Sequence, residues 1–596
     1  MTDREILICF GTACLSSGAK DIAERLQLGL RERGLQDEYP MKKAIKTTGC
    51  VGPCSLGPMM IIMPEGTMYG HLTPDDVDRI IDEHLIGGEP VASLAVQDDS
   101  HHAVADFHKI DFLAKQTKIV LRDTGFVDPL NIDDYLEREG FDALKTALTE
   151  MEPSEVIEEI KASGLRGRGG AGFPTGLKWE FTRKAEGTPK YVICNADEGD
   201  PGAFMDRSIL EGNPQSVIEA MTIAGYAIGS NRGFVYVRAE YPVAIQNLTA
   251  ALDQARQRGF LGEDIFGTGF SFDIEIRVGA GAFVCGEETA LIASIEGHRG
   301  QPRSRPPYPA QSGLWGKPTV INNVETLANV APIIRRGSEW FSSIGTETSK
   351  GTKVFAVAGD VARTGLVEVP MGMTLREIIF DIAGGIPDGK ELKAVQIGGP
   401  SGGTIPAKYL DTGVDYESLK SLGAIVGSGG MVIMDESSCM VDVARFFLEF
   451  TQEESCGKCT PCRIGTKRML EILERITRGE GEPGDIEKLE SFGKMIKATS
   501  LCGLGQTAPN PVLSTIQHFR DEYEAHIFDH RCPSRHCAAL ASYRIDPDVC
   551  VGCGTCIDEC PVEAISGSLR EPHVIDEEAC IACGACAAAC PVDAIS

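Results

Sequence analysis

The stretch SGLRGRGGAGFPTGLKWEF, residues 163–181, opens the central part of the chain with a glycine-rich loop. Its glycines follow the spacing G-x-G-x-x-G: Gly167, Gly169 and Gly172. The preceding letters PSEVIEEIKA have the pattern of a helix, whereas a dinucleotide-binding fingerprint follows a strand. Backbone without side chains nevertheless suits a phosphate or a flat cofactor. Three cations accompany the loop: Arg166, Arg168 and Lys178. The stretch therefore predicts a ligand-binding loop.

Three further polar segments lie outward from this loop along the chain. CNADEGDPGAFMDR (194–207) is flanked by glycine and proline, GAGAFVCGEETALIASIEG (279–297) opens a helix, and RSRPPYPAQSGLWGKPTVINNVETL (303–327) carries an Asn pair. Their candidate residues are Asn195, Asp197, Glu198, Gly286, Glu287, Glu288, Asn322 and Asn323. Any one segment on its own is explained by a capped loop. Their occurrence together predicts one binding site.

Length, charge and cysteine usage limit the class of protein. The 596 residues are enough for several domains, and a formal net charge of −29 argues against nucleic acid and anionic membrane surfaces as partners. No stretch approaches the ~18 apolar residues of a membrane helix, and the start MTDREILICF shows no signal peptide. The chain has 21 cysteines, and many of them sit in tight C-x-x-C groups, which favours metal ligation in a reducing cytoplasm over a disulfide framework.

The end of the chain contains an internal repeat. IDPDVCVGCGTCIDECPVEAIS begins at Ile545 and IDEEACIACGACAAACPVDAIS begins at Ile575, and each contains the run C-x2-C-x2-C-x3-C-P. That run is typical of bacterial two-cluster ferredoxins, in which the fourth cysteine of each run ligates the other cluster. One predicted [4Fe–4S] cluster thus uses Cys550, Cys553, Cys556 and Cys590, and the other uses Cys560, Cys580, Cys583 and Cys586. Zinc ribbons or disulfides are the alternative.

Two more cysteine groups predict further iron–sulfur sites. Near the start, a strand, a loop and a helix carry Cys9 and Cys14, and Cys50 and Cys54 follow before a hairpin-like stretch. This order resembles the thioredoxin-like [2Fe–2S] ferredoxin. Later, ESCGKCTPCRIG (454–465) spaces three cysteines by two residues, namely Cys456, Cys459 and Cys462. A [4Fe–4S] cluster needs four thiolates, so this run is incomplete by itself.

Residues ~115–525 together resemble the NADH-binding flavoprotein subunit of respiratory complex I. The resemblance implies FMN held by Gly167, Arg168, Gly169, Lys178, Asn195, Asp197, Glu198, Gly286, Glu287, Glu288, Asn322 and Asn323. It also implies NAD(H) on the flavin, with its adenine between the aromatic rings of Phe173, Phe181 and Tyr308 and with Arg305 nearby. Glu288 and Asp200 are the candidate catalytic carboxylates. The fourth ligand of the three-cysteine run is implied to be Cys502, in TSLCGLGQ.

The sequence departs from the usual complex I pattern at four of these positions. Asp200 replaces a Glu, Arg305 a Lys, Tyr308 a Phe, and Phe283 a Tyr. These changes alter contacts around the two cofactors without removing them. The choice between NAD and NADP is left open.

The chain has a [2Fe–2S] domain before this complex I-like part and a two-cluster ferredoxin after it. This arrangement resembles the beta subunit of trimeric, NAD-linked, electron-bifurcating iron hydrogenases. This resemblance implies a flavin subunit that exchanges electrons between NAD(H), ferredoxin and a hydrogenase. The implied partners are a hydrogenase catalytic subunit and a small [2Fe–2S] subunit, in a heterotrimer or a higher oligomer. The same module serving a formate dehydrogenase or another oxidoreductase is the alternative, and a passive electron-transfer scaffold is an alternative of a different class.

The cysteines left over suggest a zinc site. HIFDHRCPSRHC, which follows the helical region, offers several histidines and cysteines, and zinc prefers four nitrogen or sulfur ligands in a closed structural site. We predict ligation by Cys439, His526, Cys532 and Cys537, with His530 as the second choice of nitrogen ligand. Free thiols beside a surface histidine cluster are the alternative.

The predicted fold is a chain of α/β and α+β domains. The boundaries are a thioredoxin-like [2Fe–2S] domain at 1–95, a linker at 96–114, a Rossmann-like FMN and NAD(H) domain at 115–345, a β-rich, β-grasp-like (SLBB) domain at 346–434, a helical [4Fe–4S] bundle at 435–525, a zinc link at 526–540 and a two-cluster ferredoxin domain at 541–596.

Overall fold

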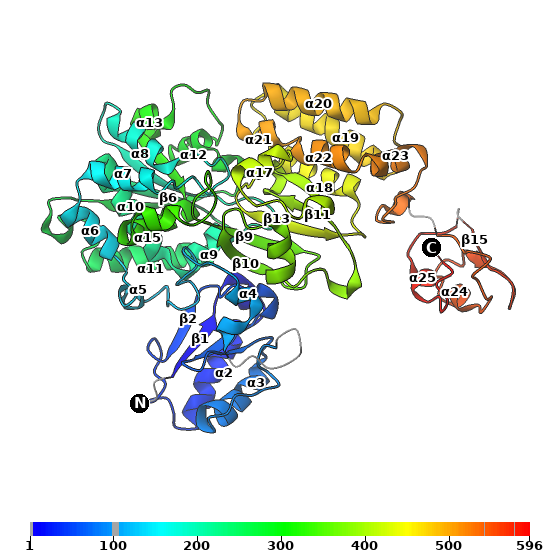
Figure 1. The fold of residues 1–596 in the computed structure, drawn as a ribbon, viewed down its shortest axis with the longest axis horizontal. Coiled ribbons are helices and arrows are strands. Elements are labelled where there is room, and N and C mark those ends of the chain that lie inside the picture. The colour runs from blue at the N-terminus through cyan, green and yellow to red at the C-terminus, as the bar shows by residue number, and fades with distance from the viewer. Residues whose placement is uncertain (1–3, 98–105, 541–542, 577–578, 596) are drawn as a thin grey trace. The chain divides into compact units, whose positions relative to one another are not determined.

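The computed structural model describes residues 4–97, 106–540, 543–576 and 579–595 of the chain. By contacts, the chain divides into two compact units, and each is described by itself. The first comprises Met1–Met434 with the short segments Glu454–Lys458 and Leu501–Leu504. The second comprises Asp435–Glu453, Cys459–Ser500 and Gly505–Ser596. Figure 1 colours the elements of both units along the chain.

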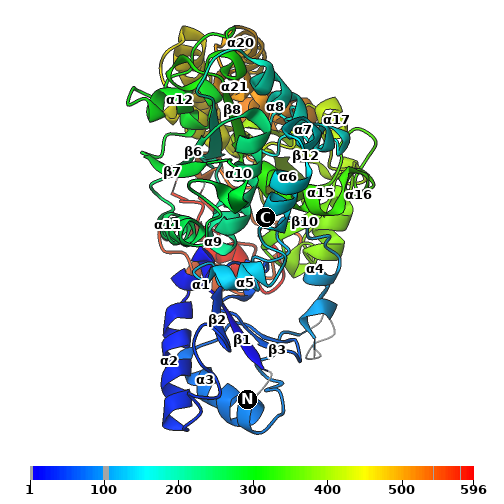
Figure 2. The same ribbon diagram turned by 90° about the vertical axis from the view of Figure 1, so that its left-hand side faces the viewer.

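A four-stranded sheet with the order β2-β1-β3-β4 forms the N-terminal domain of the first unit. Its strands are β1 (Glu5–Cys9), β2 (Ile45–Thr48), β3 (Met60–Met63) and β4 (Thr67–Tyr69). β1 pairs in parallel with β2 and antiparallel with β3, and β3 and β4 form the predicted hairpin. The amphipathic helix α2 (Ala19–Glu32) runs beside the sheet and buries Ile22, Leu26 and Leu30 (Figure 2). The thioredoxin-like prediction is confirmed.

A parallel sheet with the order β7-β6-β5-β8 forms the centre of the first unit. Its strands are β5 (Tyr191–Ala196), β6 (Arg232–Arg238), β7 (Asp273–Gly279) and β8 (Thr319–Asn323). The strands alternate with helices, chief among them α8 (Thr175–Lys184), α9 (Met205–Gly212), α10 (Pro214–Ile228), α11 (Pro242–Gln257) and α12 (Glu288–Ile295). Because parallel strands end at the same edge of a sheet, the polar residues after β5 and β8 are brought close together.

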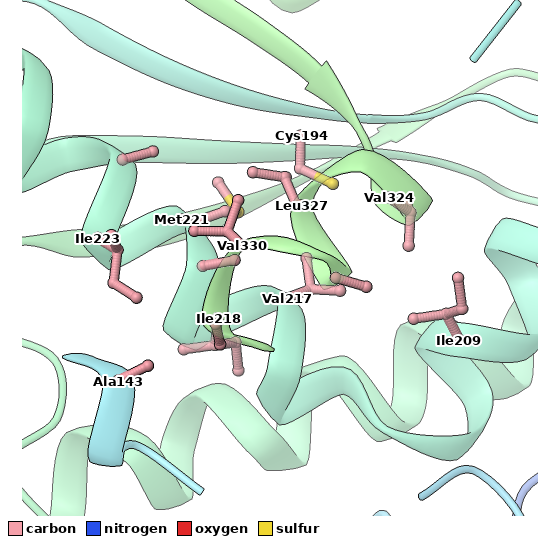
Figure 3. Close-up of a cluster of buried hydrophobic side chains, with 14 of the residues drawn as sticks. Ala143, Cys194, Ile209, Val217, Ile218, Met221, Ile223, Val324, Leu327 and Val330 are labelled. Carbon is pink, nitrogen blue, oxygen red and sulfur yellow. The ribbon is translucent and has the colours of Figure 1, made fainter. Parts of the chain in front are cut away.

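The hydrophobic core of this domain explains the order of its layers. α10 is apolar nearly all round and packs on β5 and β6. Figure 3 shows Val217, Ile218 and Met221 of α10 in one buried cluster with Cys194 of β5 and Leu327 of α14 (Val324–Ala328). Burying such side chains contributes about 1.5–3 kcal/mol each. Cys194 is fully buried here, as expected of a packing residue.

Several shorter helices flank this domain. They are α5 (Ile132–Leu136), α6 (Asp142–Glu150), α7 (Pro153–Ala162), α13 (Pro309–Ser312), α15 (Val330–Arg336) and α16 (Ser338–Ser342). α7 is the helix predicted ahead of the glycine loop, and Glu152 and Glu155 form a capping box at its start. A helix rather than a strand therefore precedes the glycine loop.

A mixed five-stranded sheet with the order β10-β9-β13-β11-β12 forms the predicted β-rich domain. Its strands are β9 (Thr352–Gly359), β10 (Gly365–Pro370), β11 (Leu392–Ile397), β12 (Gly403–Pro406) and β13 (Gly430–Asp435), with helix α17 (Tyr416–Ser421) before the last strand. β9 and β13 pair in parallel, which requires a long crossover between them.

The second unit contains helices and the C-terminal repeat. The helices are α18 (Met440–Glu453), α19 (Thr466–Thr477), α20 (Asp485–Thr499), α22 (Asn510–His518) and α23 (Arg520–Phe528). The repeat folds into two equivalent halves with the short helices α24 (Thr555–Asp558) and α25 (Ala585–Ala588) and the paired strands β14 (Ile565–Ser566) and β15 (Val574–Ile575). Its predicted first residues, 541 and 542, lie outside the described residues.

Part of the predicted linker is folded. Residues 98–105 lie outside the described residues, but Phe107, Ile110 and Phe112 are buried around the short helix α4 (Asp111–Ala114). The weak periodicity of the sequence concealed these anchors because they belong to very short helices. In the part of the chain that the structure describes, no helix combines the length and the apolar character needed to cross a bilayer.

Candidate functional site

A cavity of about 710 Å³ lies at the edge where β5 and β8 end. It is large enough for a flavin and part of a dinucleotide, since ligand sites typically span about 300–1,000 Å³. Most of the residues predicted for FMN and NAD(H) line it: Gly167, Gly169, Phe173, Lys178, Phe181, Asn195, Gly286, Glu287, Glu288, Arg305, Tyr308, Asn322 and Asn323. The structure thus brings together four segments that are far apart in the sequence.

The glycine loop forms one wall of this cavity, and two hydrogen bonds to residues of other segments hold it in place. The hydroxyl of Tyr416, on α17 of the β-rich domain, donates to the carbonyl of Gly167 (2.7 Å), and the next amide, Arg168 N–H, donates to Thr326 Oγ1 (2.8 Å). Gly172 has a φ of +62°, and a Cβ there would lie 2.8 Å from the Tyr416 ring. Only glycine fits this position without strain.

The cations of the loop do not all reach the ligand cavity. The guanidinium of Arg168 is fully buried and donates to the carbonyls of Thr352 and Arg166, and also to that of Lys350. The guanidinium of Arg166 stacks 4.1 Å from the Tyr416 ring centroid. Neither arginine is part of the cavity lining, because backbone carbonyls and an aromatic ring engage their side chains. That Arg168 helps to hold FMN stays a prediction.

Lys178 is the cation of the loop that lines the cavity. Its Nζ donates to Glu288 Oε1 and to the carbonyl of Ile321 (2.9 Å). Arg305 NH1 lies 3.8 Å from the other oxygen of Glu288. This candidate catalytic carboxylate therefore sits between two cations.

Two predicted polar residues cap helices. Glu287 accepts hydrogen bonds from the amides of Thr289 (2.9 Å) and Ala290 (3.0 Å) at the start of α12. Asn323 accepts from the amide of Thr326 (2.9 Å) at the start of α14. Each cap satisfies amides that a helix start leaves free, and it fixes the side chain at the cavity edge.

Three acidic residues follow β5, and of these Asp197 lies beside Gly286 of the cavity lining. Burial raises the pKa of Asp197 to about 7, and neither of its buried carboxylate oxygens has a partner among the described residues. Burial also raises the pKa of Glu198, whose oxygens accept the amides of Asp206 and Arg207. The unpartnered Asp197 beside Gly286 fits a ligand that supplies hydroxyl donors, such as the ribityl chain of FMN.

Asp200, the second candidate catalytic carboxylate, does not line the cavity. Its carboxylate accepts a hydrogen bond from the Ser428 hydroxyl of the β-rich domain, and burial raises its pKa to about 6. A Cβ at Gly399 would lie 2.9 Å from this carboxylate, so the β-rich domain packs closely around it. The geometry makes Asp200 a link between two domains.

Three exposed aromatic rings mark the mouth of the cavity. Phe173, Phe181 and Tyr308 are 46%, 51% and 55% exposed, although large aromatic side chains usually bury most of their surface. Their exposure is consistent with stacking faces for the adenine of a dinucleotide.

The segments that carry two of the predicted cluster cysteines touch the flavin region. Gly503, the residue after Cys502, lines the cavity. The carbonyl of Cys456 accepts from Arg299 and Gln301 (both 3.3 Å), and Glu454 accepts the amide of Phe283 (2.8 Å). Cys462 and Cys502 are buried, and Cys456 and Cys459 are partly buried.

The four N-terminal cysteines surround a second cavity, of about 220 Å³. Cys9 ends β1, Cys14 lies in helix α1 (Thr12–Ser16), and the sulfurs of Cys50 and Cys54 are 3.7 Å apart. Hydrogen bonds between the thiols, above all with Cys14, hold the pKa of Cys9 well below its usual range. The donor set fits a [2Fe–2S] cluster.

Backbone contacts hold this cysteine loop against the rest of the first unit. The carbonyl of Gly52 accepts the amide of Leu366 (3.0 Å), and Glu211 of α9 accepts both the amide (3.1 Å) and the hydroxyl (2.5 Å) of Thr12. A Cβ at Gly49 would lie 2.2 Å from Gly212 Cα. Arg207 and Ser208 of α9 also line the second cavity. α9 is the helix that follows the acidic segment of the flavin site.

The C-terminal cysteines gather in two sets. Site A consists of Cys550, Cys553, Cys556 and Cys590. Site B consists of Cys560, Cys580, Cys583 and Cys586. Each set lines its own small, apolar cavity, and each contains one cysteine from the other half of the repeat. Four thiolates in an apolar pocket suit a [4Fe–4S] cluster.

A third type of group lies in the second unit. The ligand atoms of Cys439, His526, Cys532 and Cys537 are all buried and lie within 4.8 Å of one another. Cys439 Sγ is 3.7 Å from Cys537 Sγ and 3.4 Å from His526 Nε2. A tetrahedral zinc with ~2.3 Å bonds to sulfur separates two thiolates by about 3.8 Å, so the spacing fits the metal.

The hydrogen bond made by the other ring nitrogen of His526 also suits zinc. His526 Nδ1 hydrogen-bonds the carbonyl of Glu522 (2.7 Å), which leaves Nε2 free to ligate. His530, the second choice from the sequence, is exposed and its Nδ1 contacts the carbonyl of Gly479 (3.2 Å). The structure favours His526 as the nitrogen ligand.

Sequence reasoning missed three residues around these sites. Thr326 follows Asn323 at capping distance, a signal that was available. Tyr416 carries no local signal, because only tertiary structure brings α17 to the glycine loop. His573 lines site A and is only 3% exposed, and alignment of the two repeats would have shown it opposite Tyr543.

Models of known families cover most of the chain. Residues 1–85 match the thioredoxin-like [2Fe–2S] ferredoxin, 160–332 the Nuo51 FMN-binding domain, and 354–405 the SLBB domain. Residues 442–526 match the NADH-ubiquinone oxidoreductase-F iron-sulfur binding region, and 543–596 a 4Fe-4S dicluster domain. The [2Fe–2S], FMN and [4Fe–4S] domains expected from the sequence are therefore present.

Relatives that match two thirds of the chain or more agree with these family models. The chain is 61% identical to the NADP-reducing hydrogenase subunit HndC of Solidesulfovibrio fructosivorans over 77% of this chain and 93% of that protein. It is 43% identical to an NADH-quinone oxidoreductase subunit of Escherichia coli over 67% of this chain and 90% of that protein. A crystal structure of an NAD+-reducing [NiFe]-hydrogenase covers 88% of this chain and 84% of its own, with a TM-score of 0.62 and 32% identity.

Proposed function

Because the chain belongs to the family of flavin and iron–sulfur oxidoreductase subunits found in NAD(P)-linked hydrogenases and NADH-quinone oxidoreductases, we propose that it is the NAD(H)-linked subunit of an electron-bifurcating hydrogenase. In this proposal it binds FMN, NAD(H), one [2Fe–2S] and three [4Fe–4S] clusters. It exchanges electrons between NAD(H), ferredoxin and a separate hydrogenase catalytic subunit, with a small [2Fe–2S] subunit completing the complex.

One observation carries the proposal. A single cavity has the glycine loop, a carboxylate between two cations and three exposed aromatic rings on its walls, and the residue after Cys502 completes the lining. The cavity thus combines a place for a flavin, a place for a dinucleotide and an exit toward a cluster ligand. A passive scaffold would not require this combination.

The residues of the chain have separable roles in this reaction. Bound FMN supplies the conversion between two-electron hydride transfer and one-electron transfer. Lys178 and Arg305 hold the Glu288 carboxylate at the cavity edge, where it would orient the dinucleotide. Phe173, Phe181 and Tyr308 would stack on its adenine, and Asp197 would accept hydrogen bonds from the ribityl chain.

The chain also offers more than one exit for electrons, which supports bifurcation. The [2Fe–2S] cavity is lined by α9, and the Cys456 and Cys502 segments contact the flavin region. With separate clusters around one flavin, electrons from a single donor can pass to acceptors that differ in reduction potential. A difference of 30 mV in reduction potential corresponds to ~1.4 kcal/mol for a two-electron step, so the cluster potentials decide the direction of electron flow.

The direct test is a dye assay on the purified, cluster-loaded full chain. We expect reduction of benzyl viologen by NADH, with NADPH assayed in parallel to settle the nucleotide preference. A flavin-loaded chain that reduces the dye with neither nucleotide would exclude the proposal and favour a passive scaffold. Co-purification with a hydrogenase subunit would support the hydrogenase proposal, whereas co-purification with a formate dehydrogenase would support the alternative enzyme.

We also propose that Cys439, His526, Cys532 and Cys537 bind one structural zinc. The two measured spacings and the Glu522 contact of His526 support it. Zinc has no redox chemistry of its own, so the ion would pin the segment after α23 to the start of α18. Metal analysis of Cys532→Ser should show the loss of about one zinc per chain, whereas Cys285→Ser should retain it. A parent protein without zinc would refute the site.

A further inference from the structure

The two halves of the C-terminal repeat are matched closely enough to act as controls for each other. A shift of 30 residues superimposes the repeats, as the starts at Ile545 and Ile575 show. The buried cysteines Cys556 and Cys586 are 6% and 7% exposed, and Cys553 and Cys583 are both exposed. The apolar linings of sites A and B also correspond residue by residue. Solvent access therefore does not distinguish the two sites.

Each site also receives hydrogen bonds from backbone amides. Ala594 N–H donates to Cys590 Sγ in site A, and Ala564 N–H donates to Cys560 Sγ in site B, both at 3.2 Å. Site B has a further amide contact, from Ala582 to Cys580 Sγ (3.3 Å). These contacts belong to the shared fold.

The two repeats differ at several positions, and two of these differences place a polar side chain beside a cysteine sulfur of site A. His573 Nδ1 lies 3.9 Å from Cys550 Sγ and Thr555 Oγ1 lies 3.5 Å from Cys553 Sγ, both in site A. The corresponding positions at site B are Tyr543, which lines its cavity, and Ala585, which has no polar side chain. A cluster-bound thiolate has no hydrogen, so the imidazole N–H and the hydroxyl must be the donors.

We propose that His573 and Thr555 make the cluster of site A more readily reduced than the cluster of site B. One electron adds one unit of negative charge to a cluster and its sulfurs, and no bond breaks. Donors to those sulfurs stabilise the added charge and raise the reduction potential. An electron in this domain then rests on site A, and transfer between the two clusters has a preferred direction. The inference rests on the cluster assignment made above.

A cation near site B works in the opposite direction. The guanidinium of Arg535 lies 5.7 Å from the centroid of the Tyr543 ring. The experiment therefore leaves Arg535 in place and exchanges only the residues at the two donor positions, 573 with 543 and 555 with 585. Any change in potential then reports the donors alone.

The test is an anaerobic redox titration of the full chain, followed by electron paramagnetic resonance at one fixed pH. In the parent, the two C-terminal clusters should titrate separately. In the variant Cys583→Ser, which removes a ligand of site B, the component of lower potential should disappear. Loss of the higher component instead would overturn the proposal.

Two exchange variants complete the test. His573→Tyr with Thr555→Ala should lower the higher midpoint, with the reduced-to-oxidised ratio falling about tenfold at a fixed potential, which is about 59 mV for one electron. Tyr543→His with Ala585→Thr should raise the lower midpoint, and Thr555→Ser should keep the parent value because it keeps the hydroxyl.

Iron content and signal intensity show whether each variant retains its clusters. Unchanged midpoints in cluster-loaded exchange variants would overturn this inference alone. Absence of both C-terminal signals in the parent would overturn the cluster assignment as well.

Discussion

The flavin cavity and the C-terminal repeat are built in opposite ways. The cavity draws its lining from segments between Gly167 and Gly503, and it depends on a tyrosine of another domain to fix its glycine loop. Sites A and B draw all their cysteines from residues 550–590. The difference teaches that a cluster site can be specified by local spacing, whereas a flavin site needs the whole sheet. The following predictions test that contrast.

The largest expected effect is on flavin binding. A Cβ at Gly169 would lie 3.1 Å from the Cβ of Asn323, and a larger side chain would enter the cavity. Gly169→Val should weaken FMN binding by about 100-fold or more, from the loss of several kcal/mol of contacts. Flavin fluorescence after gel filtration measures it. Full FMN occupancy in this variant would contradict the placement of the loop, and unchanged C-terminal cluster signals serve as the control.

The next effect concerns the carboxylate between two cations. Glu288→Gln removes one charge but keeps the shape, so FMN and iron content should stay intact. We expect kcat/KM for NADH to fall about tenfold or more, because Lys178 and Arg305 lose their charged partner at the cavity edge. Steady-state dye reduction measures the loss. Glu275→Gln, which changes an exposed carboxylate of β7 outside the cavity lining, is the matched control. Near-parental turnover of Glu288→Gln would remove Glu288 from the dinucleotide site.

A smaller effect is a pH dependence that comes from Asp197. Its pKa is raised to about 7, so in the flavin-free chain the carboxyl is protonated below that pH, and ionisation costs stability as the pH rises through it. Hydroxyl donors of FMN stabilise the ionised form, so FMN binding releases a proton. FMN affinity should therefore increase several-fold from about pH 6 to about pH 8. Equilibrium titration should show this slope in the parent and a flat profile in Asp197→Asn; equal slopes would refute the contact.

The smallest expected effect is that of a cluster ligand on the flavin site. Cys583→Ser should damage site B and reduce electron flow to ferredoxin or a hydrogenase. NADH–dye turnover should stay within about twofold of the parent, because the flavin cavity contains no residue of the repeat. A folded variant whose dye activity collapses would show that the two regions are coupled and would break the contrast.

Much of the flavin site followed from its motifs, and the exceptions have physical causes. The motifs predicted most of the cavity lining, but not the burial of Arg168 or the distance of Asp200 from the cavity. In both cases the β-rich domain supplies partners, namely backbone carbonyls and the Ser428 hydroxyl. Residue type shows that a side chain can bind a ligand, but it does not show which neighbour competes for it.

The sequence by itself determined the cysteine groups, the order of the domains and the pairing of cysteines between the two repeats. These follow from the spacing of the cysteines, because a cluster is bound by thiolates that lie at the required distances from one another. The residue types left over predicted the zinc group, and the structure brings its four ligand atoms within 4.8 Å of one another. Tertiary structure alone decided which cations reach the flavin cavity, and it placed Tyr416 against the glycine loop. It also placed His573 and Thr555 on one side of a duplicated domain. Such contacts depend on packing between elements that are distant in the chain, and local sequence patterns do not contain that packing.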